Sequence, residues 1–218
     1  THVAETKAEV DDARAATHET PLARLDRLGA TGPAFIAIHA VHLDAGDIDR
    51  LATQRCHVVH CPGSNMKLAS GIAPIEALLA RNINVALGTD GAASNNRLDL
   101  FGEMRLASLL AKVATGDAAA VPAATALRMA TLNGALALGL DGEIGSLEVG
   151  KQADVTAVRI ADVATLPMYD AASHLVNVAG REHVTDVWVG GDRIVEGGQL
   201  TTIDSAALCS RANAWQQR

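Results

Sequence analysis

A chain of 218 residues is long enough to bury a sizeable core in one large domain, or in one domain and part of another. Of its residues 49% are hydrophobic and 20% are charged, which is typical of a globular protein and excludes a disordered one. The formal net charge of −7, without a basic run, argues against a nucleic acid or an anionic membrane surface as the partner.

Hydropathy and cysteine usage narrow the class of protein further. No apolar run approaches the length of a membrane span, and no secretory signal peptide is evident. Cys56, Cys61 and Cys209 have no metal-binding spacing, and any pairing leaves one of them over. We therefore expect reduced thiols and a cytoplasmic protein.

Strand-like and helix-like segments alternate from the start of the chain. Residues 2–6 have the pattern of a strand that is ending, and further strands are predicted at 34–38, 56–60 and 83–87. Helices are predicted at 9–28 with a break at Thr20-Pro21, and at 44–54, 74–80, 98–114 and 121–138. This alternation is typical of a parallel barrel or a doubly wound sheet.

The first part of the chain corresponds to about half of a barrel. A complete eight-stranded barrel typically needs about 250 residues, and the βα pattern here ends near residue 140. The chain also begins with Thr rather than Met, in a strand that is already ending. We therefore expect the C-terminal portion of a longer protein.

The pattern changes after Gly139, where turn residues become frequent. Short β-like runs follow at 153–160, 184–189 and 192–195, with Gly190-Gly191 as a hairpin turn between the last two. We therefore predict three parts: residues 1–142 are half of a barrel, residues 143–204 are part of a small β domain, and residues 205–218 are a C-terminal helix.

Each of the four early strands ends in a polar residue: His2 with Glu5, then His39, His60 and Asp90. The carboxyl ends of parallel strands share one edge, where α/β barrels have their active sites. His2 and Asp90 are candidate metal ligands, Glu5 is a candidate for proton transfer, and His39 could polarise or orient the reacting group. A single histidine at a strand end is more often structural, but four polar strand ends favour a metal-dependent hydrolase.

Six motifs stand in order along the chain: HVAET (2–6), IHAVHL (38–43), VVHCPGSNMKLASG (58–71), LGTDGAASNN (87–96), ATLNGALALGL (130–140) and IGSLEVGKQADV (144–155). This ordered set, which covers essentially the whole chain, resembles the amidohydrolase superfamily. The branch it is most similar to is that of the 5-methylthioadenosine/S-adenosylhomocysteine deaminases. The loop after Asp90, followed by Phe101, Glu103 and Arg105, favours the adenosine-type deaminases.

The resemblance implies an α/β fold: the C-terminal half of a TIM-like (β/α)8 metallo-hydrolase barrel with part of a small β-sandwich domain. It implies that His2 binds the metal from the fifth barrel strand. Asp90 is implied to bind the metal and to take a proton from bound water. Glu5 is implied to contact the purine and move protons, and His39 to be an active-site histidine. The implied metal is Zn²⁺, although Fe²⁺ uses the same ligand types.

A second group of residues matches a segment that lines the family's site. His60, Ser64 and Asn65 are implied to lie against the substrate together with Glu5 and Asp90. The implied substrate is a small nucleoside whose amino group leaves as ammonia, and the implied assembly is a homo-oligomer.

One departure from the family pattern concerns the metal. The family has a metal-binding His-x-His pair on its first barrel strand, and this sequence has none. It supplies two of the implied ligands, whereas zinc sites usually have three protein ligands and a water. The predicted partner is therefore the missing N-terminal half of the same protein.

Three interpretations stay open at this stage. The first is a zinc-dependent deaminase of 5-methylthioadenosine or S-adenosylhomocysteine. The second is another amidohydrolase, such as a guanine deaminase or a triazine chlorohydrolase. The third is an inactive fragment that serves only as a scaffold.

Overall fold

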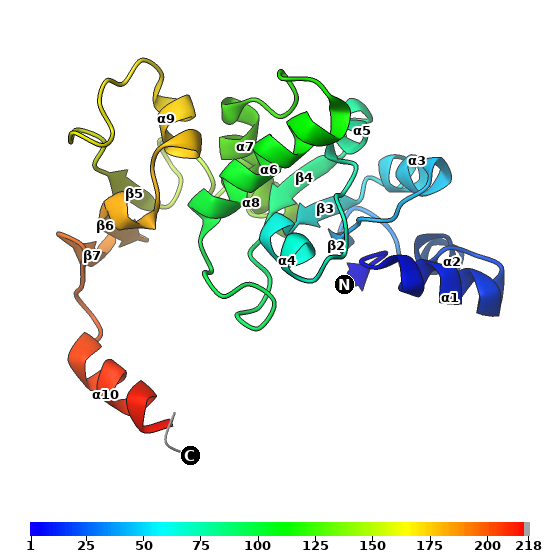
Figure 1. Ribbon diagram of the computed structural model, residues 1–218, viewed down its shortest axis with the longest axis horizontal. Coiled ribbons are helices and arrows are strands. Elements are labelled where there is room, and N and C mark those ends of the chain that lie inside the picture. Colours follow the sequence, from blue (N-terminus) through cyan, green and yellow to red (C-terminus); the bar gives the residue numbers. More distant parts are fainter. Residues whose placement is uncertain (216–218) are drawn as a thin grey trace.

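A four-stranded parallel sheet forms the centre of the computed structural model, which describes residues 1–215 (Figure 1). Its strands are β1 (His2–Val3), β2 (Ile36–His39), β3 (His57–His60) and β4 (Asn84–Leu87), and neighbours in sequence are neighbours in the sheet. The register pairs His2 with Ile38, Ile36 with His57, and His60 with Leu87. All four predicted strands are confirmed, and their carboxyl ends lie at one edge.

The helices that lie between β1 and β3 begin at residues whose side chains cap them. α1 (Lys7–Thr17) and α2 (Pro21–Arg27) are separated at Thr20, whose side chain accepts from the Ala23 amide while Pro21 starts the second helix. Asp44 caps α3 (Ala45–Thr53) in a reciprocal capping box with Asp47. The break at Thr20-Pro21 and the predicted cap at Asp44 are both confirmed.

Buried aliphatic side chains hold the helices against the sheet. α5 (Ile75–Ala80) and α6 (Leu100–Thr115) pack against β4 and against each other (Figure 1). The core between sheet and helices contains Leu22, Leu51, Val58, Leu78, Val85 and Met129, all at most 1% exposed. This core fixes the strand ends whose polar residues make the candidate site.

One local prediction in this region is wrong, and one short helix was missed. The single helix expected at 121–138 is two helices, α7 (Ala123–Ala130) and α8 (Leu132–Leu138), which meet at a non-helical Thr131. The change of direction lets the buried Asn133 amide donate to the Val85 carbonyl of β4, 2.8 Å away. The short helix α4 (Pro62–Lys67) follows β3 directly and was not expected, since its first flanking residue, Cys61, forms no side-chain cap.

A second, antiparallel sheet lies in the C-terminal part. It contains β5 (Val155–Val158), β6 (Val184–Val189), β7 (Asp192–Glu196) and β8 (Gln199–Leu200). Gly190 and Gly191 both have positive φ, 58° and 90°, so the predicted two-residue hairpin turn is confirmed. The division of the chain at residues 142 and 204, and the β-sandwich nature of the second part, stay predictions.

Two helices accompany this second sheet. α9 (Ala171–Asn177) was not predicted, and it packs on α6, where Arg105 donates to the carbonyls of Val176 and Ala179. It is followed by the short 3-10 helix η1 (Arg181–His183). α10 (Ser205–Trp215) begins at the residue where the terminal helix is predicted to begin, and the predicted end at 216–218 lies outside the described residues.

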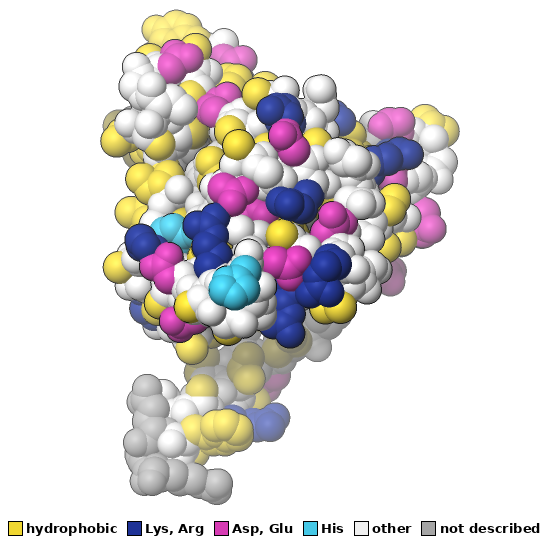
Figure 2. Space-filling view, turned by 90° about the vertical axis from the view of Figure 1, so that its right-hand side faces the viewer, with side chains coloured by type: hydrophobic (Ala, Val, Ile, Leu, Met, Phe, Trp, Pro, Cys, Tyr) yellow, Lys and Arg dark blue, Asp and Glu magenta, His cyan; other side chains and the backbone are white. Residues whose placement is uncertain are grey.

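The face over the N-terminal helices carries charges of both signs (Figure 2). Cationic and acidic side chains are interspersed on it. At α1, the first of these helices, Lys7 pairs with Asp11 and Arg14 pairs with Asp44. Such a mixed surface does not form the continuous basic area that nucleic acid requires. Among the described residues, no helix has both the length and the apolar character needed to cross a bilayer.

Candidate functional site

Three side chains with metal-binding atoms meet at the carboxyl edge of the parallel sheet. They are His2 on β1, His39 at the end of β2 and Asp90 just after β4, and their donor atoms lie within 4.8 Å of one another. The two histidine rings are edge to face, with centroids 5.1 Å apart. The predicted convergence of His2, His39 and Asp90 is therefore present in the structure.

The backbone at this edge is strained at the residues that carry the chemistry. His39 has φ of 73° and Asp90 has φ of 61°, in the left-handed region that non-glycine residues seldom occupy. Ala4 and Ala40, which lie beside the site, also have positive φ angles, of 51° and 48°. Residues in such conformations concentrate at functional sites, where the surrounding structure holds them in place.

Glu5 joins the cluster from the turn after β1. Its Oε2 lies 3.8 Å from His39 Nε2, and the same nitrogen lies 4.0 Å from Asp90 Oδ2. Glu9 holds this turn, because its two carboxylate oxygens accept from the amides of Ala4 and Glu5 at 2.8 Å each. His39 Nε2 thus faces two carboxylates in a space open enough to leave Glu5 partly exposed.

Ser64 and Asn65 lie behind these side chains on α4. Ser64 Oγ donates to Asp90 Oδ2 at 2.7 Å, and Asn65 Oδ1 lies 2.8 Å from His39 Nδ1. Both α4 side chains are buried, at 0% and 1% exposed. These contacts orient Asp90 and His39, whereas direct contact of Ser64 or Asn65 with a substrate stays a prediction.

Hydrogen bonding and burial set the protonation of the site. The Ser64 hydroxyl, with the Gly91 amide, holds the pKa of Asp90 below its ordinary value, so this carboxylate is ionised at neutral pH. Burial lowers the pKa of His60 to about 3, and within residues 1–215 its Nδ1 has no hydrogen-bond partner. Burial likewise raises the pKa of the Cys61 thiol to about 12, so neither His60 nor Cys61 carries charge at pH 7.

The remaining histidines near the sheet have structural contacts. His42 Nε2 bonds the Ser70 carbonyl at 2.6 Å. His57 lies at the opposite end of β3 from His60, and it contacts the Pro33 carbonyl and the Asn84 side chain. The interpretation of His42 as structural is consistent with these contacts.

Two acidic residues with contacts at the site were not assigned a role from sequence. Glu9 holds the Glu5 turn, and the buried Glu103 accepts from the Gly63 amide and from the Asn95 side chain. The position of Glu9, four residues after Glu5, is a local signal that could have been used. Glu103 contacts a residue 40 positions away, for which the sequence carries no local signal.

Comparison with known proteins agrees with this geometry. A family model described as the amidohydrolase family matches residues 1–194. The chain belongs to the amidohydrolase family. The parallel sheet with polar carboxyl ends is therefore part of the family's barrel fold, as the sequence predicted.

Two curated relatives that match nearly the whole chain are named as deaminases. It is 47% identical over 215 residues to a 5-methylthioadenosine/S-adenosylhomocysteine deaminase of Saccharophagus degradans, covering 99% of this chain and 48% of that protein. It is 48% identical over 207 residues to the enzyme of that name from Moorella thermoacetica, and this match covers 95% of this chain and 48% of that protein. The chain thus spans about half the length of the curated relatives it matches.

Solved structures show the same relationship. An adenosine deaminase from Xanthomonas campestris, crystallised with bound zinc, has a TM-score of 0.97 and 48% identity, covering 100% of this chain and 49% of its own. A zinc complex of atrazine chlorohydrolase from Arthrobacter aurescens has a TM-score of 0.92 and 28% identity, and the match covers 98% of this chain and 47% of that one. The fold is shared by both, and sequence identity is greater with the deaminase.

Proposed function

We propose that the protein to which this chain belongs is a zinc-dependent deaminase of adenosine-type nucleosides, acting on 5-methylthioadenosine and S-adenosylhomocysteine. The observation that carries the proposal is the cluster of His2, His39 and Asp90 beside Glu5. Its substrate class is supported by 47–48% identity to deaminases of that name.

The donor set fits zinc. Imidazole nitrogens and a carboxylate oxygen are ordinary zinc ligands, and iron accepts the same types. His2 and Asp90 would hold the ion, with His39 beside it. When bound, zinc supplies a water whose pKa is lowered toward neutrality.

The chain's own residues would move the protons of the reaction. Asp90, kept ionised by Ser64, would accept a proton as water adds to the amine-bearing carbon of the purine. Glu5 would donate a proton to the adjacent ring nitrogen, and His39 would stabilise the developing tetrahedral centre through Nε2. The carbon–nitrogen bond then breaks, and the amino group leaves as ammonia with the proton that Asp90 had accepted. The hydroxyl proton passes to Glu5, which restores its acid form as a ring carbonyl replaces the amine.

A further segment would complete the site. Within the described residues, β1 and β4 each have one side without a strand partner, and the sequence has no His-x-His pair. Relatives are about twice as long as this chain. We propose that a segment equivalent to their other half closes the sheet and supplies the remaining ligands, in a cytoplasmic homo-oligomer.

A substrate panel tests the activity. The protein containing this chain and the completing segment is assayed for ammonia release from 5-methylthioadenosine, S-adenosylhomocysteine, adenosine and guanine, and for chloride release from a chlorotriazine. Turnover of the adenosine-type nucleosides alone is the expected result. Preferred turnover of guanine or the triazine would assign the protein to the guanine deaminases or the triazine chlorohydrolases instead. No turnover by the zinc-loaded protein would refute the proposal.

Glu5→Gln tests the proton transfer in the same protein. The amide cannot donate a carboxylic proton, so turnover should be lost while one zinc per chain is retained. Near-normal turnover of this variant would contradict the role of Glu5.

A further inference from the structure

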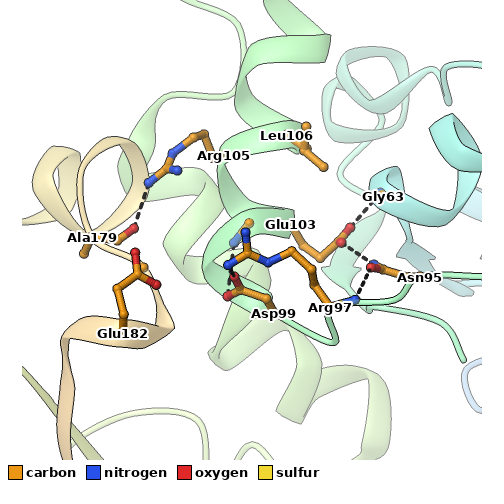
Figure 3. Close-up of a pocket in the computed structure, with 11 residues that line it drawn as sticks. Gly63, Asn95, Arg97, Asp99, Glu103, Arg105, Leu106, Ala179 and Glu182 are labelled. Carbon is orange, nitrogen blue, oxygen red and sulfur yellow. Dashed lines mark hydrogen bonds and ion pairs between the residues drawn. The ribbon is translucent and has the colours of Figure 1, made fainter. Parts of the chain in front are cut away.

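The buried Glu103 links the two segments that hold Asp90 and His39. It extends from the first turn of α6, is 3% exposed, and lies between α4 and the loop after Asp90 (Figure 3). Its Oε2 accepts from the Gly63 amide of α4 at 2.8 Å, and its Oε1 accepts from the Asn95 side chain at 2.6 Å. One carboxylate therefore bonds both segments at once.

On the α4 side, Glu103 supplies a cap that the local sequence lacks. The first amides of a helix have no partner within the helix, and Cys61, which precedes α4, forms no side-chain cap. Glu103 satisfies the Gly63 amide from a different helix, which fixes the start of α4. The next two residues, Ser64 and Asn65, are those that bond Asp90 and His39.

On the other side, Glu103 fixes the loop that follows Asp90. The backbone amide of Asn95 donates to the Gly91 carbonyl at 2.8 Å, and the Asn95 side chain donates to Glu103. The turn from 91 to 95 is thus tied to α6 directly beyond Asp90. Among the described residues, Glu103 forms no hydrogen bond or ion pair with His2, His39 or Asp90, so it acts through these two segments.

The packing leaves little room for movement at this link. A Cβ added at Gly63 would lie 2.4 Å from Glu103 Oε1 and 2.7 Å from Asn95 Nδ2. Both distances are shorter than any normal contact, so the close approach of Glu103 depends on glycine at position 63. We propose that Glu103 is a positioning residue, which sets Asp90 and His39 through Gly63 and Asn95. This inference rests on the proposed hydrolytic site.

Glu103→Gln is the first test, in the complete zinc-loaded protein. A glutamine side chain has one acceptor oxygen, so its amide nitrogen must face either the Gly63 or the Asn95 donor. We expect kcat and zinc affinity to fall about 10- to 100-fold, as for other residues that orient metal ligands, with KM less affected. Asn95→Ala, which removes only one of the two bonds, is the second variant should Glu103→Gln fail to fold, and a smaller loss in the same direction is expected.

Two further variants separate positioning from general stability. Glu76→Gln is the matched control, because Glu76 also accepts a backbone amide, that of Val121 at 2.6 Å, but on α5 and away from the site. The double variant Glu103→Gln/Asn95→Asp reverses donor and acceptor across the link, and we expect it to recover most of the loss.

The outcomes decide the inference separately from the activity. A loss in Glu103→Gln that exceeds that of Glu76→Gln and is recovered in the double variant supports it. Equal effects of the two single variants, or no recovery, overturn it. If the protein turned over no nucleoside, the proposed function would fail, and zinc affinity across the same variants would still decide the role of Glu103.

Discussion

Acidification is expected to destabilise this protein through His60. The side chain is 1% exposed and Nδ1 has no partner among the described residues, so a proton added there would find neither water nor an acceptor. Burial therefore places the pKa at about 3 in the folded protein, against 6.5 for an ordinary histidine. The unfolded chain binds the proton more tightly, so the stability due to neutral His60 is complete above pH 6.5 and is lost as the pH falls from there toward 3.

The size of this effect follows from the pKa difference. Each pH unit below 6.5 costs about 1.4 kcal/mol while the folded protein stays unprotonated at this residue. At pH 5 the loss from His60 is therefore about 2 kcal/mol, a large fraction of a typical free energy of unfolding.

Urea unfolding followed by circular dichroism at pH 7 and pH 5 measures the effect. His60→Gln replaces the imidazole by a side chain that does not titrate, so its free energy of unfolding should fall less over this interval, by about 2 kcal/mol. The stability of the variant at pH 7 does not matter, because each protein is compared with itself. An equal fall in both proteins would show that His60 is not a buried neutral histidine.

Ser64→Ala removes the hydroxyl that lowers the pKa of Asp90, so this pKa should rise and the acid limb of the pH profile of kcat/KM should move to higher pH. An acid limb that does not move would refute the assignment of Asp90 as the base. Leu51→Ala leaves a cavity at a fully buried position between α3 and the sheet, and it should lower the free energy of unfolding in urea by about 2–5 kcal/mol. A decrease of less than about 1 kcal/mol would mean that the core is not packed there. Chelation should abolish activity and lower Tm, and zinc should restore both; a Tm unchanged by chelation would argue against a bound ion at His2 and Asp90.

Local signals in the sequence were sufficient to place the main elements. The four parallel strands, the cap at Asp44, the break at Thr20-Pro21 and the Gly190-Gly191 turn were each predictable, because they depend on residues close together in the chain. The polar strand ends were predictable for the same reason, and parallel topology brought them to one edge. The family motifs added the expected role of each residue.

What the sequence could not determine depends on residues that are distant in the chain. α4 starts without a local cap, since its first free amide is satisfied by Glu103, 40 residues later. The break at Thr131 accompanies the bond from Asn133 to Val85, 48 residues away.

The neutrality of His60 likewise follows from burial that the neighbouring strands and helices create together. The sequence by itself determined which polar strand-end residues are candidates for the site. The tertiary structure alone decided how they are held and which of them carry charge, because caps, desolvation and side-chain hydrogen bonds act between segments that only folding brings together.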